Sequence, residues 1–370
     1  MAGIEKYANL LIDYSISLQE GDELLINGPT ASLPLIREMY KLALLRGAFP
    51  TVILEDAVIQ ELFYRHASQK HLERVPPIVE FLYEKYNVHV TIYAPEHTRL
   101  LAGVDPEKQA LRRKVFRHLT EKFLREAAEG KKRWTLAPFP TLAMAQEANM
   151  SPIEFEEFVY RALKLDEPDP VQAWRRQASL QKRVVDLLEK ADEITIVAPG
   201  ASLTVKVSGR KWISDEGKEN MPGGEVFTGP HEDGVDGCVR FDFPSVYSGR
   251  FVDGAKLCFR NGEVVEYDAT VGRDFLAKML NVDDGARRVG EFAFGLNYSI
   301  SRQTNILLFD EKIGGTMHIA IGQGYPETGS KNSSSIHWDM IKDLRSPEAK
   351  VYVDGDLVYE AGKFRIWNED

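Results

Sequence analysis

Residues 23–54 read ELLINGPTASLPLIREMYKLALLRGAFPTVIL, and their hydrophobic pattern sets the architecture of the first half of the chain. Apolar residues run together over 23–26 and 49–54, as in buried strands, and recur at helical spacing over 33–45. Gly47 follows the helical stretch, where a helix commonly ends. Strand, helix and strand in succession predict a βαβ unit with parallel strands.

The same alternation continues on both sides of this unit. Further strands are predicted over 88–93 and 134–137, and helices over 4–18, 106–129 and 151–163. We therefore expect an α/β layer with a largely parallel sheet. Neither GxGxxG after the first strand nor GxxxxGK[ST] occurs, which argues against a nucleotide-binding layer.

The composition and the predicted elements change after a helix predicted over 171–191. Strands become shorter and glycine denser, with a hairpin predicted over 257–267 and a terminal antiparallel pair over 351–366. We predict an α/β N-terminal domain over residues 1–190. A β-rich α+β domain is predicted over 191–370.

The charge balance bears on the class of partner. With 46 basic and 56 acidic residues the formal net charge is −10, which disfavours nucleic acid and anionic membranes, because both need basic surface. Apolar segments are short and interrupted, so we expect no membrane span. We also expect no signal peptide, and we interpret Cys238 and Cys258 as two buried, reduced thiols. These features predict a cytoplasmic protein.

Two histidines stand in strand-like stretches whose polar residues share one face. In GTMHIAIG (315–322), His318 lies on the face opposite the methionine and isoleucines. In SIHWDM (335–340), His337 and Asp339 share the face opposite isoleucine, tryptophan and methionine. Such side chains suit metal ligation. Taken alone, each stretch is also compatible with an ordinary hydrogen-bonded histidine or a polar edge strand.

Two glutamates show the same pattern. Glu291 in VGEFAFG (289–295) lies on the face opposite two phenylalanines, and Glu225 follows a Pro-Gly-Gly turn. A carboxylate in such surroundings is costly to bury unless something positive meets it. Each glutamate, taken alone, is also compatible with a wet strand face.

Together, two glutamates, one aspartate and two histidines match a pair of divalent ions. Three carboxylates and a bridging hydroxide nearly balance the four charges of two such ions, and imidazole with carboxylate suits zinc, manganese or cobalt better than calcium. Two ions lower the pKa of a shared water and polarise a carbonyl, which is what amide hydrolysis needs. Tyr325 in GQGYPET is a candidate oxyanion donor or simply a loop aromatic.

Four segments carry a resemblance to a known family. They are NMPGGEVFTGP (220–230), GARRVGEFAFGLN (285–297), MHIAIGQGYPETG (317–329) and SSIHWDM (334–340). In content and order they resemble the aminopeptidase T / aminopeptidase S family of dinuclear metallo-aminopeptidases, also called the thermophilic aminopeptidases.

The resemblance implies a set of ligands and an activity. The family's metal ligands fall on Glu225, Glu291, His318, His337 and Asp339, and its site tyrosine falls on Tyr325. Members are homodimers that carry cobalt, zinc or magnesium and remove N-terminal residues from peptides. The implied mechanism is attack by a metal-bridging hydroxide on the first peptide carbonyl, with Glu225 or Glu291 moving the proton to the leaving amine.

Two alternatives remain open from sequence. His318, His337 and Asp339 alone would form the facial triad of a mononuclear non-haem iron ring-cleaving dioxygenase. The presence of both Glu225 and Glu291 favours the dinuclear hydrolase over it. A dimeric binding protein that holds metal without catalysis is the second alternative.

Overall fold

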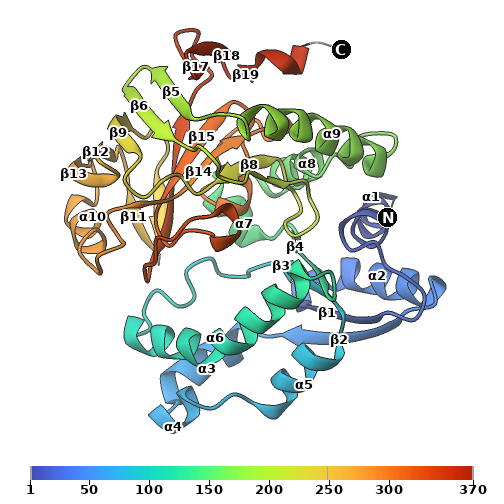
Figure 1. Cartoon of the computed structure of the whole chain (residues 1–370). Coiled ribbons are helices and arrows are strands. Elements are labelled where there is room, and N and C mark those ends of the chain that lie inside the picture. Colours follow the sequence, from blue (N-terminus) through green and yellow to red (C-terminus); the bar gives the residue numbers. More distant parts are fainter. Residues whose placement is uncertain (1, 248, 369–370) are drawn as a thin grey trace. The chain divides into compact units, whose positions relative to one another are not determined.

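The computed structural model describes residues 2–247 and 249–368, which form two compact units (Figure 1). The α/β unit comprises the chain up to Ala173 together with Gly217–Pro222, and the β unit comprises Trp174–Glu216 and the chain from Gly223 onward. The break in packing falls earlier than residue 190, because Val184 and Leu188 of the helix spanning it belong to the hydrophobic core of the β unit.

The α/β unit is built around a parallel sheet of four strands among the described residues, in the order β2-β1-β3-β4. The strands are β1 Glu23–Pro29, β2 Phe49–Glu55, β3 Val88–Tyr93 and β4 Arg133–Pro138. Because β1 pairs in parallel with both β2 and β3, the predicted βαβ unit and parallel sheet are confirmed. Segment Gly217–Pro222 joins this unit through hydrogen bonds between Leu136 and Glu219 and between Met221 and Leu136.

Helices precede, connect and follow these strands. They are α1 Ala2–Leu10, α2 Leu33–Leu45, α3 Ala57–His66, α4 Gln69–Leu72, α5 Pro77–Lys85, α6 Pro106–Ala128, α7 Leu142–Glu147 and α8 Pro152–Ala162. The start of α8 illustrates how sequence sets a boundary: Ser151 accepts from the backbone N–H of Glu154, in a capping box. The predicted helix over 4–18 differs, since α1 continues only as a π-helical turn over Leu11–Ser15.

The β unit contains antiparallel sheets. The larger has the order β13-β12-β9-β6-β5-β17-β18-β19, a second has the order β16-β15-β14-β8-β7, and β10 pairs with β11. Their bounds are β5 Glu193–Ala198, β6 Ala201–Lys206, β7 Ile213–Asp215, β8 Glu225–Thr228, β9 Val235–Arg240, β10 Ser245–Tyr247, β11 Arg250–Val252, β12 Lys256–Arg260, β13 Glu263–Asp268, β14 Val289–Gly295, β15 Thr316–Gly322, β16 His337–Asp343, β17 Lys350–Val353, β18 Asp356–Glu360 and β19 Lys363–Phe364. The helices are α9 Pro170–Leu188, α10 Arg273–Met279 and α11 Leu307–Asp310.

The hydrophobic core of the β unit draws on both large sheets and on α9. Phe292, Met317 and Trp338 lie in it, side by side with residues of β5 and β6 such as Ile196 and Leu203. These three come from β14, β15 and β16, so the faces predicted for those strands are confirmed. The opposite face of the same sheet is left for polar side chains.

The predicted hairpins are confirmed by turns with positive φ. Asn261 and Gly262 have φ of 49° and 75° between β12 and β13, and Asp354 and Gly355 have 51° and 91° between β17 and β18. The α/β N-terminal fold and β-rich C-terminal fold are therefore confirmed. No helix in the described part of the chain is long and apolar enough to cross a membrane.

The interpretation of the two cysteines as reduced thiols is wrong. Cys238 on β9 lies opposite Cys258 on β12, with 4.0 Å between their Cα atoms, and the two form a disulfide. The pairing follows from strand register. The 20-residue separation in sequence gave no sign of it.

Candidate metal centre

The five predicted ligands lie on four neighbouring strands of the sheet with the order β16-β15-β14-β8-β7. Glu225 is on β8, Glu291 on β14, His318 on β15, and His337 and Asp339 on β16. Register brings them together, because Ala320 of β15 pairs with both Glu291 and Asp339. The structure thus places all five on the sheet face turned away from the core.

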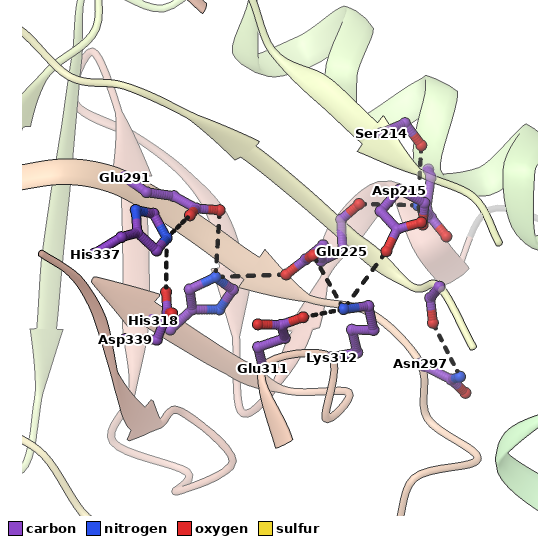
Figure 2. A network of polar contacts seen from close by, with 12 residues as sticks. Ser214, Asp215, Glu225, Glu291, Asn297, Glu311, Lys312, His318, His337 and Asp339 are labelled. Atoms are coloured by element: carbon purple, nitrogen blue, oxygen red, sulfur yellow. Dashed lines mark hydrogen bonds and ion pairs between the residues drawn. The ribbon is translucent and has the colours of Figure 1, made fainter. Parts of the chain in front are cut away.

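Their side-chain atoms approach one another closely (Figure 2). Nε2 of His318 lies 3.4 Å from Oε2 of Glu225 and 3.5 Å from Oε1 of Glu291. Nε2 of His337 lies 3.1 Å from Oε2 of Glu291 and 3.6 Å from Oδ1 of Asp339. The two oxygens of Glu291 therefore face different histidines.

The cluster divides into two groups that share Glu291. One group is Glu225, Glu291 and His318, and the other is Glu291, His337 and Asp339. Ligand atoms held about 2.0–2.2 Å from one ion lie roughly 3–3.5 Å from one another, which is close to the separations observed. Oε2 of Glu225 is buried and has no hydrogen-bond partner among the described residues. The donor set and the spacing fit a divalent ion in each group.

The carboxylates of the cluster favour positive charge on the two histidines. Burial lowers the pKa of His318, but its hydrogen bond to Glu291 and the charges of Glu225 and Glu291 raise it to about 9. Burial likewise lowers the pKa of His337, and the charges of Asp339 and Glu291 raise it to about 10. Burial raises the pKa of Glu291, but hydrogen bonds from both histidines bring it to about 2.

The other two carboxylates respond mainly to burial. It raises the pKa of Asp339 to about 6 against the charge of His337. It raises that of Glu225 well above the usual value against the charge of Lys312. Buried carboxylates of this kind are stabilised by cations.

Glu225 owes its place to the backbone around it. Gly224 has a φ of 116°, and a Cβ there would lie 2.5 Å from the Cβ of Asn297, so glycine is needed at this close approach. Gln181 of α9 donates from Nε2 to the carbonyls of Glu225 and Asp215. These contacts fix the start of β8.

A backbone contact orients His337. Its Nδ1 lies 2.8 Å from the carbonyl oxygen of Gln323, which accepts when Nδ1 carries the hydrogen. Nε2 is then left facing Glu291 and Asp339. Metal-ligating histidines usually have such a partner on the second ring nitrogen.

Tyr325 lies next to this group. Its ring packs against Phe227 and His337, each at 5.2 Å between centroids. Burial, with the charges of Glu291 and Asp339, raises its pKa. The hydroxyl therefore keeps its proton.

Three charged residues beside the cluster were not identified from the sequence: Lys312, Asp215 and Glu311. Lys312 is fully buried and contacts Asp215, Glu225 and Glu311. A signal was present: the charged run Asp310-Glu311-Lys312 directly follows an apolar stretch and precedes β15.

A pocket opens beside the second group. His337 and Asp339 line one part of it, and Tyr247, Leu307 and Trp338 supply apolar walls. Ligand pockets usually combine such apolar walls with a few polar groups.

A β unit whose sheet gathers carboxylates and imidazoles into two groups around a shared glutamate is suited to metal-dependent hydrolysis. The class of protein is therefore a metal-dependent hydrolase. The particular family follows from comparison: the model of the thermophilic metalloprotease family (M29) matches residues 2–364, and the chain belongs to this family.

Relatives share nearly the whole chain. Aminopeptidase 2 of Geobacillus stearothermophilus is 32% identical over 378 residues, covering 95% of this chain and 90% of that protein. Aminopeptidase T of Thermus aquaticus is 29% identical, covering 88% and 85%. The solved structure of wild-type AmpT from Thermus thermophilus matches with a TM-score of 0.84 and 25% identity, over 98% of this chain and 99% of that one.

The dioxygenase alternative finds no support in these relatives. The geometry also separates its three ligands, because His318 belongs to one group and His337 and Asp339 to the other. The chain is a metal-dependent hydrolase of peptide bonds.

Proposed function

We propose that this chain is an aminopeptidase that binds two divalent ions. Glu225, Glu291 and His318 would hold one ion, and Glu291, His337 and Asp339 would hold the other. The observation that carries the proposal is the division of the Glu291 carboxylate, whose Oε1 faces His318 and whose Oε2 faces His337. The names of the relatives supply the substrate, a peptide with a free N-terminus.

The ligand set restricts the metal. Imidazole with carboxylate suits zinc, cobalt or manganese, and magnesium is compatible with the carboxylates. Two such ions would polarise the scissile carbonyl and lower the pKa of a water molecule.

The remaining steps fall to side chains of the chain itself. The hydroxyl of Tyr325 donates a hydrogen bond to the oxyanion that develops on the carbonyl oxygen. Of the two glutamates, Glu225 would move the proton to the leaving amine, because both oxygens of Glu291 face the histidines of the two groups. The pocket beside His337 and Asp339 receives the N-terminal side chain of the substrate.

The experiment that tests this activity uses one peptide in two forms. Metal-loaded protein is expected to release only the first residue from the free peptide and to leave the N-acetylated copy intact. Cleavage at internal bonds, or equal cleavage of the acetylated copy, would contradict an aminopeptidase.

Assembly and location are further parts of the proposal. We expect a homodimer, which analytical ultracentrifugation would detect as twice the chain mass of 41.8 kDa. We expect a cytoplasmic location. Recovery of the protein outside the cytoplasm with its Cys238–Cys258 disulfide intact would contradict it.

A further inference from the structure

Lys312 is a fully buried lysine beside the first group of ligands. It lies between α11 and β15, and its Nζ is 3.3 Å from Oε1 of Glu225 and 3.5 Å from Oδ2 of Asp215. It also pairs with Glu311 (Figure 2). A lysine is almost never fully buried without such partners.

These contacts divide the carboxylate of Glu225 between two tasks. Oε1 faces the ammonium group of Lys312, and Oε2 faces Nε2 of His318 at 3.4 Å. Oε2 has no hydrogen-bond partner within the described residues, so it is the oxygen directed at the group. The ammonium lies on the opposite oxygen, where its charge is compensated by Glu225 and Glu311.

The charge balance of the enlarged cluster agrees with this division. Its carboxylates are Asp215, Glu225, Glu291, Glu311 and Asp339, and Lys312 contacts three of them. With neutral imidazoles, and before any bridging hydroxide is counted, the five carboxylates and one ammonium leave four negative charges. Two divalent ions supply four positive charges, and paired charges are what a buried site tolerates.

We propose that Lys312 is a positioning residue for one of the two ions. It holds Oε1 of Glu225 so that Oε2 stays directed at the group formed with Glu291 and His318. This inference rests on the proposed function, since it needs the ion to bind there. Within the described residues, no ion pair joins Lys312 to the second group, Glu291 with His337 and Asp339. The affinity for the ion of that group is therefore expected to be unchanged.

The test is the metal affinity of Lys312→Met. Metal-free protein is titrated with zinc or cobalt by calorimetry, and bound ions are counted after dialysis. We expect one ion to bind about 10–100-fold more weakly, as for other partners of metal ligands, while the second ion keeps its wild-type affinity. Near-ultraviolet circular dichroism verifies that the variant is folded.

Lys342 provides a matched control. It too is a buried lysine of the β unit, but its Nζ contacts the carbonyl of Pro199 and the carboxylate of Asp242. Lys342→Met is expected to bind both ions with wild-type affinity. If Lys312→Met does not fold, Lys312→Gln, whose side chain is shorter and uncharged, takes its place and is expected to show the same selective weakening.

Three results would overturn the inference. They are unchanged affinity for both ions, equal weakening of both ions, and tighter binding of either ion in a folded Lys312 variant. Failure of the proposed function is distinguishable, because wild-type protein would then fail to bind two ions at all.

Discussion

Oε2 of Glu291 lies 3.1 Å from Nε2 of His337, while its other oxygen faces the histidine of the neighbouring strand. The paired registers of β14, β15 and β16 impose this arrangement. One carboxylate thus serves two groups of ligands, and the loss of this residue has a different consequence from the loss of any other.

Glu291→Ala is therefore expected to release both ions. The shared carboxylate belongs to both groups, so neither retains three ligands. Elemental analysis after dialysis should find close to no metal, and peptide hydrolysis should fall to background. Retention of one tightly bound ion would show that Glu291 is not shared.

His318→Ala and Asp339→Ala should each weaken one ion, because each residue belongs to one group. Activity should be lost in both, since hydrolysis needs the pair of ions. His231→Ala is the control: His231 is hydrogen-bonded to Ser208 and belongs to neither group. Full activity in both test variants would refute the site.

Tyr325→Phe should keep both ions and lose activity. Removing one hydrogen-bond donor to an oxyanion typically lowers kcat by about 10²–10³-fold. Tyr352→Phe, on β17 of the other large sheet, is the control and should retain activity. Wild-type kinetics in Tyr325→Phe would remove the hydroxyl from the mechanism.

Gly224→Ala should destabilise the protein and weaken metal binding. The new Cβ would lie 2.5 Å from the Cβ of Asn297, at a φ of 116°, and overpacking of this kind costs about 1–3 kcal/mol. Gly355→Ala is matched in having positive φ, but a Cβ there meets nothing within 4 Å. Denaturant unfolding of both variants, with metal content, separates crowding from backbone strain. Equal destabilisation with wild-type metal content would count against the role of Gly224.

Acid should destabilise the protein in part through His89 on β3. Burial, together with the charge of Lys132, lowers the pKa of His89 to about 4 although the carbonyl of Tyr86 opposes the shift. Between pH 6.5 and 4 the unfolded chain binds a proton that the folded chain does not. Stability is thus complete above pH 6.5 and falls as the pH drops, by about 2 kcal/mol at pH 5.

His89→Phe should lose less stability between pH 7 and pH 5, since phenylalanine does not titrate. The new ring should be accommodated, because the ring of His89 already packs against that of Phe123. Denaturant unfolding at the two pH values gives the comparison. The same loss in both proteins would contradict the assignment.

The period of a strand explains how much of the site was predictable. Alternation alone separated Phe292 and Phe294 from Glu291, and Trp338 from His337 and Asp339, because side chains of a strand point to opposite faces. The βαβ pattern of residues 23–54 likewise predicted the parallel sheet, and α2 has the bounds predicted for it.

What the sequence could not supply depends on contacts between distant segments. The disulfide between Cys238 and Cys258 follows from the pairing of β9 with β12. Lys312 lies outside the regular strands, so the alternation of side chains along a strand does not show that its side chain points inward. Val184 packs in the hydrophobic core of the β unit, and the boundary between the units lies within α9.

The central claim is that two ions act together, and one titration tests it most directly. Metal-free protein receives zinc or cobalt stepwise, and hydrolysis of an aminoacyl-p-nitroanilide is followed alongside the number of ions bound. We expect activity to reach its plateau at about two ions per chain, the stoichiometry of a two-metal site. A plateau at one ion, or one iron per chain with oxygen uptake and no peptide hydrolysis, would contradict the account.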